Sequence, residues 1–438
     1  MKNLKKVSRI LSATVLIKHQ NFGTAKASHT KTAFSMHQKL KTLRHRMLLD
    51  GSFNTFSRQL NFHHLGFSNL SDANENMMTN KSLDRQKNLQ QTNKNCPGVK
   101  SIAEQHDTFL LDMWGVMHDG SRPYGGVLDT IKKMKDCGKR MIILSNSSKR
   151  QVESIAMLAK LGFDPDNFDQ IITSGEVSHR ILSGDTTLPF KQWHILSKIL
   201  STKKNCELKA FVFGSGNGDE EYCRTAGWEL SSINEADIII ARGTFTINDG
   251  TTVVSKKDGE DLYFRHLQDT LKTAALRQVP MIVCNPDKVR PDKGLPPMPG
   301  AIGDTYESFL DHNFDSKKDS KDLVKRIGKP FLEVYALAIG DTDPTNAVMV
   351  GDALETDITG GELAGCKTCW IVKDGIHSEA IEVANDNQKN NGINTDSLLL
   401  FEKSCLKVLE EFNEQKKVRY HLGHGVIKPS YILPHFQW

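Results

Sequence analysis

The sequence predicts an α/β protein: a Rossmann-like parallel sheet with helices on its faces and a second domain inserted into it. Two observations carry this prediction. From residue 100 onward, short apolar runs alternate with segments of helical periodicity, which is the pattern of parallel strands joined by helices. The same pattern returns after residue 330, and the long region between the two blocks has strands and helices of its own.

The first block, residues 99–180, is predicted to form the first part of the sheet domain. Short apolar runs predict buried strands over 108–113 and 140–144. Apolar residues at helical spacing predict helices over 126–135 and 149–160, and a glycine follows each of them as a stop signal. This strand–helix order places successive strands side by side and parallel.

The second block, residues 311–415, is predicted to complete the same sheet. Its apolar runs predict strands over 347–350 and 367–372, and its helical periodicity predicts helices over 331–339 and 356–363. This alternation of strands and helices is similar to that of the first block. We therefore expect both blocks to belong to one domain that the middle region interrupts.

The middle region, residues 181–310, is predicted to fold as an inserted α/β domain. Apolar runs predict strands over 210–213, 236–241 and 280–284, and a longer periodic segment predicts a helix over 262–278. The final residues, 416–438, are expected to form a C-terminal tail whose aromatic side chains pack on the sheet domain.

The charge is unevenly distributed along the chain. Residues 1–99 hold 16 Lys/Arg and 4 Asp/Glu, whereas the remainder holds 41 and 48. This basic composition predicts a disordered N-terminal extension over 1–98 that acts as a transit peptide to the mitochondrion, with plastid or cytoplasm as the alternatives. A plain basic tail or a misassigned start remains the competing interpretation. The acidic body indicates no nucleic-acid partner, and no apolar run is long enough to predict a membrane span.

Polar side chains with matching chemistry lie at the ends of the predicted strands. Asp112 follows the first strand and Ser145 follows the second, while Asp352 follows a strand of the second block. Because the carboxyl ends of parallel strands meet at one edge, these groups are expected to converge. Lys329 opens a predicted helix and Asp357 lies five residues beyond Asp352.

This set of groups suits phosphoryl transfer. Asp112 and Asp352 can hold Mg²⁺, which offsets the repulsion between an anionic nucleophile and a phosphate dianion. Lys329 can neutralise the negative charge of the transferring group, and the Ser145 hydroxyl can donate to a phosphate oxygen. Asp112 would then form an aspartyl-phosphate that water cleaves.

The order Asp, Ser, Lys and Gly-Asp-x-x-x-x-Asp at these positions resembles the haloacid dehalogenase superfamily. The large insert between the Ser and Lys motifs is similar to the C2-capped class IIA, which includes p-nitrophenyl phosphatases. Segments typical of that class are found at Asn285-Pro286-Asp287, at Pro299–Gly303 and at Thr173–Glu176. The resemblance covers residues 100–380 and implies a sheet domain with a C2 cap domain.

The resemblance also implies roles for individual residues. Asp112 would be the nucleophile and a Mg²⁺ ligand, and Lys329 would neutralise charge. Asp352 would bind Mg²⁺, and Asp357 would bind it directly or support the residues that do. The phosphate would be held by Ser145, Asn146 and Lys329. The implied partner is a small phosphorylated metabolite, and class IIA relatives suggest a homodimer formed through the cap.

One position departs from the family pattern Asp-x-Asp-Gly. The second aspartate, the family's general acid and base, is replaced here by Trp114. Its backbone carbonyl is still expected to contact the metal. We expect His118 or Asp119 to supply the proton, or good leaving groups to need none. The sequence therefore leaves open a phosphatase, a catalytically weakened protein that binds phosphate esters in a regulatory role, and a phosphotransferase.

Overall fold

The computed structural model describes residues 98–203, 206–290, 296–313, 322–390, 397–419 and 426–438. The predicted N-terminal extension, with its transit peptide and mitochondrial address, lies outside the described residues except for Gly98. None of the described helices is both long enough and apolar enough to cross a membrane.

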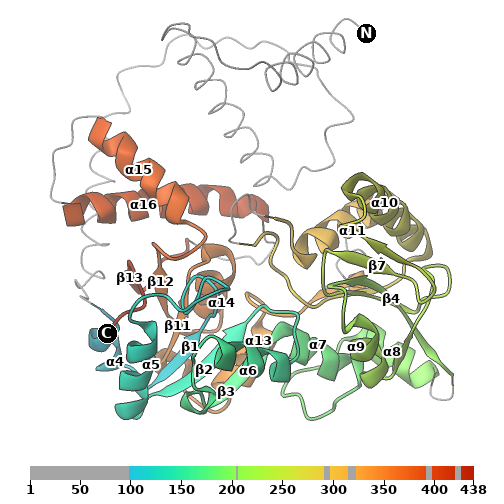
Figure 1. Ribbon diagram of the computed structural model, residues 1–438, viewed down its shortest axis with the longest axis horizontal. Helices are drawn as coiled ribbons and strands as arrows, with labels where there is room; N and C mark the ends of the chain where they lie inside the picture. The colour runs from blue at the N-terminus through green and yellow to red at the C-terminus, as the bar shows by residue number, and fades with distance from the viewer. Residues whose placement is uncertain (1–97, 204–205, 291–295, 314–321, 391–396, 420–425) are drawn as a thin grey trace, which may run out of the picture. The chain divides into compact units, whose positions relative to one another are not determined.

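The first sheet contains six parallel strands in the order β13-β12-β11-β1-β2-β3 (Figure 1). Thr108 is paired with Ala347 on one side and with Arg140 on the other, so strands from both blocks lie in one sheet, as predicted. The strands are β1 (Thr108–Leu111), β2 (Arg140–Ser145), β3 (Gln170–Thr173), β11 (Ala347–Gly351), β12 (Lys367–Ile371) and β13 (Tyr431–Leu433).

Helices cover both faces of this sheet because successive strand residues point to opposite sides. In β1, Phe109 and Leu111 pack with α5 and α6, whereas Leu110 packs with α7 and α13. The helical elements of this domain are α4 (Val99–Ala103), α5 (Val127–Asp136), α6 (Gln151–Lys160), η2 (Pro165–Asn167), α7 (Ser174–Leu182), α13 (Leu332–Ile339), η3 (Pro344–Asn346), η4 (Leu354–Ile358), α14 (Thr359–Leu363), α15 (Ser378–Asn390) and α16 (Ser397–Arg419).

The inserted domain is built on a second sheet in the order β10-β9-β6-β4-β7-β8, with β5 also paired to β4. Figure 1 shows α10 and α11 side by side against this sheet. Its elements are α8 (His194–Thr202), β4 (Leu208–Gly214), α9 (Asp219–Thr225), β5 (Trp228–Leu230), β6 (Ile238–Ala241), β7 (Thr246–Asn248), β8 (Val253–Ser255), α10 (Glu260–Arg277), β9 (Met281–Val283), α11 (Pro299–Asn313) and β10 (Val324–Arg326).

The boundaries of the inserted domain differ from the expected 181–310. Strand β10 pairs with β9 through Val324 and Met281, so the second sheet extends to Arg326 and the second part of the sheet domain begins after it. One buried apolar cluster contains residues of both sheets, including Leu110 of β1 and Ile240 of β6. The two domains therefore share part of their core.

The C-terminal residues do more than pack on the core as a tail. They add β13 as an edge strand next to β12, and the side chain of Phe436 is fully buried. The backbone of Gln437 accepts a hydrogen bond from the Val99 amide at 2.7 Å. The two ends of the described chain are thus joined at one edge of the first sheet.

The burial of Phe436 leads to a stability prediction. Phe436→Ala removes a large buried side chain and leaves a cavity, so we expect the free energy of unfolding to fall by about 3–5 kcal/mol. The measurement is the midpoint of denaturant unfolding. Val426→Ala is the matched control, because Val426 is 78% exposed and its loss should change stability by less than about 0.5 kcal/mol. Equal effects of the two substitutions would contradict the packing described here.

Candidate active site

The predicted site residues meet at the carboxyl edge of the first sheet. Asp112 directly follows β1, Ser145 ends β2 and Asp352 directly follows β11. Since β1 lies between β2 and β11 and all three are parallel, their ends open onto the same edge. The Asp112 amide donates to the Val350 carbonyl at 3.0 Å, which ties the start of the loop after β1 to the neighbouring strand.

Three carboxylates form a candidate metal centre. Each of Asp112, Asp352 and Asp357 offers an oxygen, and these oxygens lie within 4.8 Å of one another. Asp352 and Asp357 are buried. Asp357 is placed by η4, a turn of π-helix, and its Oδ2 accepts a hydrogen bond from the Ala353 amide at 3.1 Å. Clustered hard oxygen ligands of this kind fit a divalent cation.

Two glycines allow the acidic groups to approach this closely. Gly115 has a φ of +82°, and a Cβ on it would lie 2.4 Å from the Asp352 carboxylate carbon. A Cβ on Gly351 would lie 2.1 Å from the same carbon of Asp357. Any other residue at either position would push a carboxylate out of the cluster.

Lys329 is a buried cation in contact with two members of this acidic cluster. Its Nζ lies 2.6 Å from Asp112 Oδ1 and 2.6 Å from Asp357 Oδ1, and its side chain is 2% exposed. Burial lowers the pKa of Lys329, but the charges of Asp112 and Asp357 outweigh burial and hold this pKa above its usual value. Lys329 is therefore protonated over the whole physiological range.

The pKa values of the three clustered carboxylates are raised. Burial raises the pKa of Asp357 to about 6, although Lys329 opposes this rise. Burial, together with the charges of Asp357 and Asp112, raises the pKa of Asp352 well above its usual range. Burial also raises the pKa of Asp112. A bound cation would relieve this repulsion because it favours the ionised forms.

Ser145 and Asn146 occupy different surroundings at the end of β2. Ser145 is buried, and its Oγ accepts from the Ser147 amide at 3.2 Å. Asn146 uses its carboxamide on the backbone of Lys329: its Oδ1 accepts from the Lys329 amide at 2.7 Å, and its Nδ2 donates to the Lys329 carbonyl at 3.0 Å. In this arrangement Asn146 holds the lysine, and its predicted contact with phosphate stays a prediction.

His118 and Asp119 are engaged in local structure. The Gly120 amide donates to His118 Nδ1 at 2.9 Å, and burial lowers the pKa of His118 to about 4, so the ring is neutral at pH 7. Asp119 accepts from the Ser121 amide at 2.9 Å and the Ser121 hydroxyl at 2.7 Å, and the hydroxyl contact is the largest cause that lowers its pKa. Such an Asx-type turn stabilises the loop. The predicted catalytic roles of both residues stay predictions.

Trp114 lies in the same loop as these two residues. A Cβ on Gly120 would come within 2.7 Å of the Trp114 ring, so the glycine makes room for the indole. The guanidinium carbon of Arg290, from the inserted domain, lies 5.9 Å from the centre of that ring. The side chain at the position of the missing aspartate thus contacts both domains. A metal contact from the Trp114 carbonyl stays a prediction.

Asp287 has no role predicted from the sequence, but the structure brings it to the site. Its Oδ1 accepts a hydrogen bond from Asn146 Nδ2 at 2.7 Å. Burial raises the pKa of Asp287 to about 6, and its charge contributes to the raised pKa of Asp112. The Asn285-Pro286-Asp287 segment was visible in the sequence, but nothing in it showed that the segment reaches the sheet edge.

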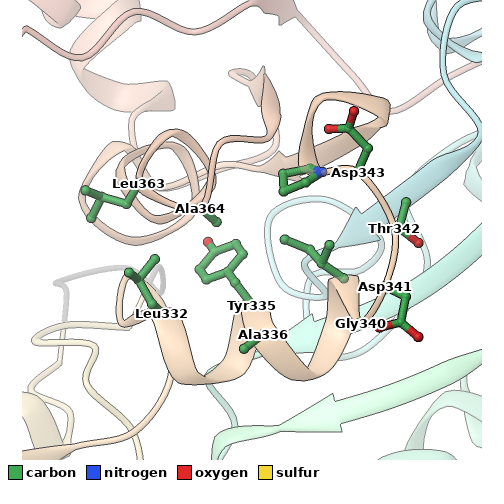
Figure 2. A pocket seen from close by; sticks show the side chains of 11 residues that line it. Leu332, Tyr335, Ala336, Gly340, Asp341, Thr342, Asp343, Leu363 and Ala364 are labelled. Atoms are coloured by element: carbon green, nitrogen blue, oxygen red, sulfur yellow. The ribbon is translucent and has the colours of Figure 1, made fainter. Parts of the chain in front are cut away.

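A separate surface groove of about 490 Å³ lies on the first domain and contains none of the predicted site residues. Figure 2 shows Tyr335 on α13 with Leu332 and Ala336, facing Leu363 at the end of α14 and Ala364 directly after it. The Tyr335 hydroxyl donates to the Asp357 carbonyl at 3.3 Å. The packing of α13 therefore supports the turn that carries Asp357 through its backbone carbonyl.

A parallel sheet whose edge carries three clustered carboxylates and a buried lysine defines an α/β enzyme with an acidic cation site. The chain belongs to the haloacid dehalogenase-like hydrolases. A family model described as haloacid dehalogenase-like hydrolase matches residues 109–229, and a second model of hydrolases of the same superfamily matches residues 326–396. The two matched segments contain Asp112, Lys329 and Asp352.

Several characterised proteins are similar to this chain. Phosphoglycolate phosphatase 2 of Arabidopsis thaliana is 27% identical over 71% of this chain and 96% of its own length. The 4-nitrophenylphosphatase of Schizosaccharomyces pombe is 24% identical over 64% of this chain and 88% of its own. A solved haloacid dehalogenase-like hydrolase from Brucella suis has 19% identity and a TM-score of 0.47, and covers 65% of this chain and 91% of its own.

The raised carboxylate pKa values predict a pH-dependent effect of metal. Burial raises the pKa of Asp357 to about 6 and the pKa of Asp352 well above its usual range. A cation must displace the protons that these groups hold at low pH, so the stabilisation by Mg²⁺ should grow as the pH rises through 6 and above. At pH 7.5 and 100 times Kd it should reach about 2.7 kcal/mol, and at pH 5 it should be far smaller. The measurement is the unfolding free energy with and without Mg²⁺.

The control for this prediction is Asp352→Asn, which removes one charged ligand and should abolish most of the Mg²⁺ effect at pH 7.5. Asp311→Asn changes an exposed carboxylate on α11 and should leave the effect intact. A stabilisation of equal size at both pH values, or in Asp352→Asn, would show that the cation binds elsewhere.

Proposed function

We propose that this protein is a Mg²⁺-dependent phosphatase that hydrolyses a small phosphorylated metabolite through an aspartyl-phosphate on Asp112. The observation that carries the proposal is the contact of Lys329 Nζ with Asp112 at 2.6 Å, next to a cluster of carboxylates at the edge of a parallel sheet. The similar phosphatases named above are consistent with this reaction class.

In the first step Asp112 attacks phosphorus. A carboxylate oxygen of Asp112 forms a bond to phosphorus, the bond from phosphorus to the ester oxygen breaks, and the leaving alkoxide takes a proton from water. Lys329 stabilises the charge on the phosphoryl oxygens, and the hydroxyl of Ser145 donates to one of them. Bound Mg²⁺, held by Asp112, Asp352 and Asp357, would supply positive charge that lets two anions approach each other.

In the second step water attacks the phosphorus of the aspartyl-phosphate. The bond between phosphorus and the Asp112 oxygen breaks, inorganic phosphate leaves and the carboxylate is regenerated. Lys329 again stabilises the negative charge that develops on the phosphoryl oxygens. The inserted domain faces this edge through Asp287 and Arg290, so we assign substrate choice to it. A homodimer through the cap and a mitochondrial address stay predictions.

Trp114 supports a second candidate function, a protein that binds phosphate esters and turns them over poorly. A general acid or base is worth roughly 10²–10⁴-fold in rate, and the indole offers no proton acceptor. Tight binding of phosphate esters without hydrolysis across a broad set of monoesters would favour this candidate. Transfer to added alcohols would instead indicate a phosphotransferase.

Asp112→Asn tests the nucleophile. The amide is nearly isosteric but is a poor nucleophile, so phosphate release should fall by roughly 10³-fold or more. The assay is phosphate release from p-nitrophenyl phosphate and a panel of metabolite monoesters, with Mg²⁺ and with EDTA. Asp311→Asn, at an exposed position on α11, is the matched control. The proposal would be contradicted if Asp112→Asn released phosphate at the wild-type rate, or if EDTA did not reduce the rate.

Trp114 also predicts how the rate depends on the leaving group. Without a general acid at this position, kcat/KM for p-nitrophenyl phosphate should exceed that for glycerol phosphate by roughly 10²-fold or more, because nitrophenolate leaves without a proton. Trp114→Asp should reduce this ratio of kcat/KM values. Trp114→Asn should not, because Asn has the size of Asp but cannot act as an acid. An identical ratio in all three proteins would mean that position 114 has no part in proton transfer.

A further inference from the structure

The segment that follows β9 in the inserted domain makes a direct polar contact with the catalytic edge of the other domain. Asp287, at the end of the Asn285-Pro286-Asp287 segment, accepts a hydrogen bond at its Oδ1 from Asn146 Nδ2 at 2.7 Å. Asn146 is buried, at the end of β2. Neither the metal cluster nor the nucleophile uses Asp287, so its position calls for a separate explanation.

Asn146 connects Asp287 to the lysine of the site. The Lys329 amide donates to Asn146 Oδ1 at 2.7 Å, and Asn146 Nδ2 donates to the Lys329 carbonyl at 3.0 Å. Both backbone polar groups of Lys329 are therefore held by one side chain. The Lys329 Nζ lies 2.6 Å from Asp112, so a shift of this backbone would move the ammonium away from the reacting carboxylate.

The contacts also fix the orientation of the Asn146 amide. The Lys329 N–H is a donor, so it must face the Asn146 oxygen rather than the nitrogen. The Asn146 N–H₂ group then points to the Lys329 carbonyl and to Asp287. Without an acceptor at residue 287, one N–H of a buried amide would lose its partner, which is unfavourable and weakens the hold on Lys329.

Close backbone packing keeps Asp287 in place. Gly328, directly before Lys329, has a φ of +129°, and a Cβ on it would lie 2.5 Å from Asn146 Oδ1 and 2.8 Å from the Pro286 ring. The Gly300 amide donates to the Asp287 carbonyl at 3.0 Å, and a Cβ on Gly300 would lie 2.1 Å from the Pro286 oxygen. The start of α11 therefore packs closely on the backbone of Pro286 and Asp287 and supports it.

We propose that Asp287 is a positioning residue for Lys329, acting as the hydrogen-bond acceptor that orients Asn146. The inserted domain thereby contributes to the charge-neutralising group of the other domain, and the site is complete only when the two domains are packed together. The effect on turnover rests on the proposed phosphatase function; the effect on the Lys329 backbone does not. The Asn285-Pro286-Asp287 and Pro299–Gly303 segments acquire a shared role as the support of this contact.

The experiment compares Asp287→Ala, which removes the acceptor, with Asp287→Asn, which keeps an acceptor oxygen in the same place. Asp311→Ala, an exposed carboxylate on α11, is the control. The full-length proteins are assayed with p-nitrophenyl phosphate and Mg²⁺, and kcat and KM are determined separately. Amide hydrogen exchange at Lys329 is measured in the same proteins, because that N–H donates to Asn146.

For Asp287→Ala we expect kcat to fall about 10- to 100-fold, the range for residues that orient a catalytic group, with KM changed less than kcat. Exchange at the Lys329 amide should become faster. For Asp287→Asn we expect kcat within about 3-fold of the wild type, since its oxygen still accepts from Asn146, and unchanged exchange at Lys329. Asp311→Ala should match the wild type in both measurements.

Two results would overturn the inference. One is an Asp287→Asn protein more than 10-fold impaired, which would mean that the carboxylate charge or its proton matters and not its acceptor oxygen. The other is an Asp287→Ala protein with normal kcat and normal Lys329 exchange. If Asp287→Ala does not fold, the kcat of Asp287→Asn and its hydrogen exchange at the Lys329 amide still test the inference. If the wild type shows no turnover, the function fails, but the exchange measurement still tests the contact.

Discussion

The buried contact of Lys329 with Asp112 and Asp357 is the interaction on which the rest of the site depends. Burying an ammonium group is costly unless carboxylates compensate its charge, and here two of them lie 2.6 Å from Nζ. The same contact opposes the rise that burial causes in the pKa values of Asp112 and Asp357. One ammonium cannot balance the whole cluster, so the remaining negative charge gives the site its affinity for a cation.

The fold brings these groups together from distant parts of the chain. Asp112 and Lys329 are separated by the whole inserted domain, and they meet because Asn146, at the end of β2 beside β1, holds the Lys329 backbone. The inserted domain is not a separate attachment, since it shares a buried cluster with the first sheet and sends Asp287 to Asn146. Substrate selection and the support of Lys329 can therefore depend on the same domain packing.

Much of the fold could be predicted from periodicity. The strands expected over 140–144 and 347–350 are found as β2 and β11 with nearly the same bounds, because residues buried on both faces leave a continuous apolar run. The short strands were harder to predict. Nothing local marked β10 (Val324–Arg326) as part of the second sheet or β13 (Tyr431–Leu433) as the edge of the first, since pairing with a distant strand defines both.

The sequence by itself determined the chemistry available at the sheet edge. Asp112 and Asp352 end apolar runs, and strand direction alone carries them to one side. Only the tertiary structure decided how these groups are used. Asn146 binds the backbone of Lys329, and Asp287 reaches Asn146 from the inserted domain. Hydrogen bonds between residues more than a hundred positions apart depend on domain packing, which no local pattern of residues encodes.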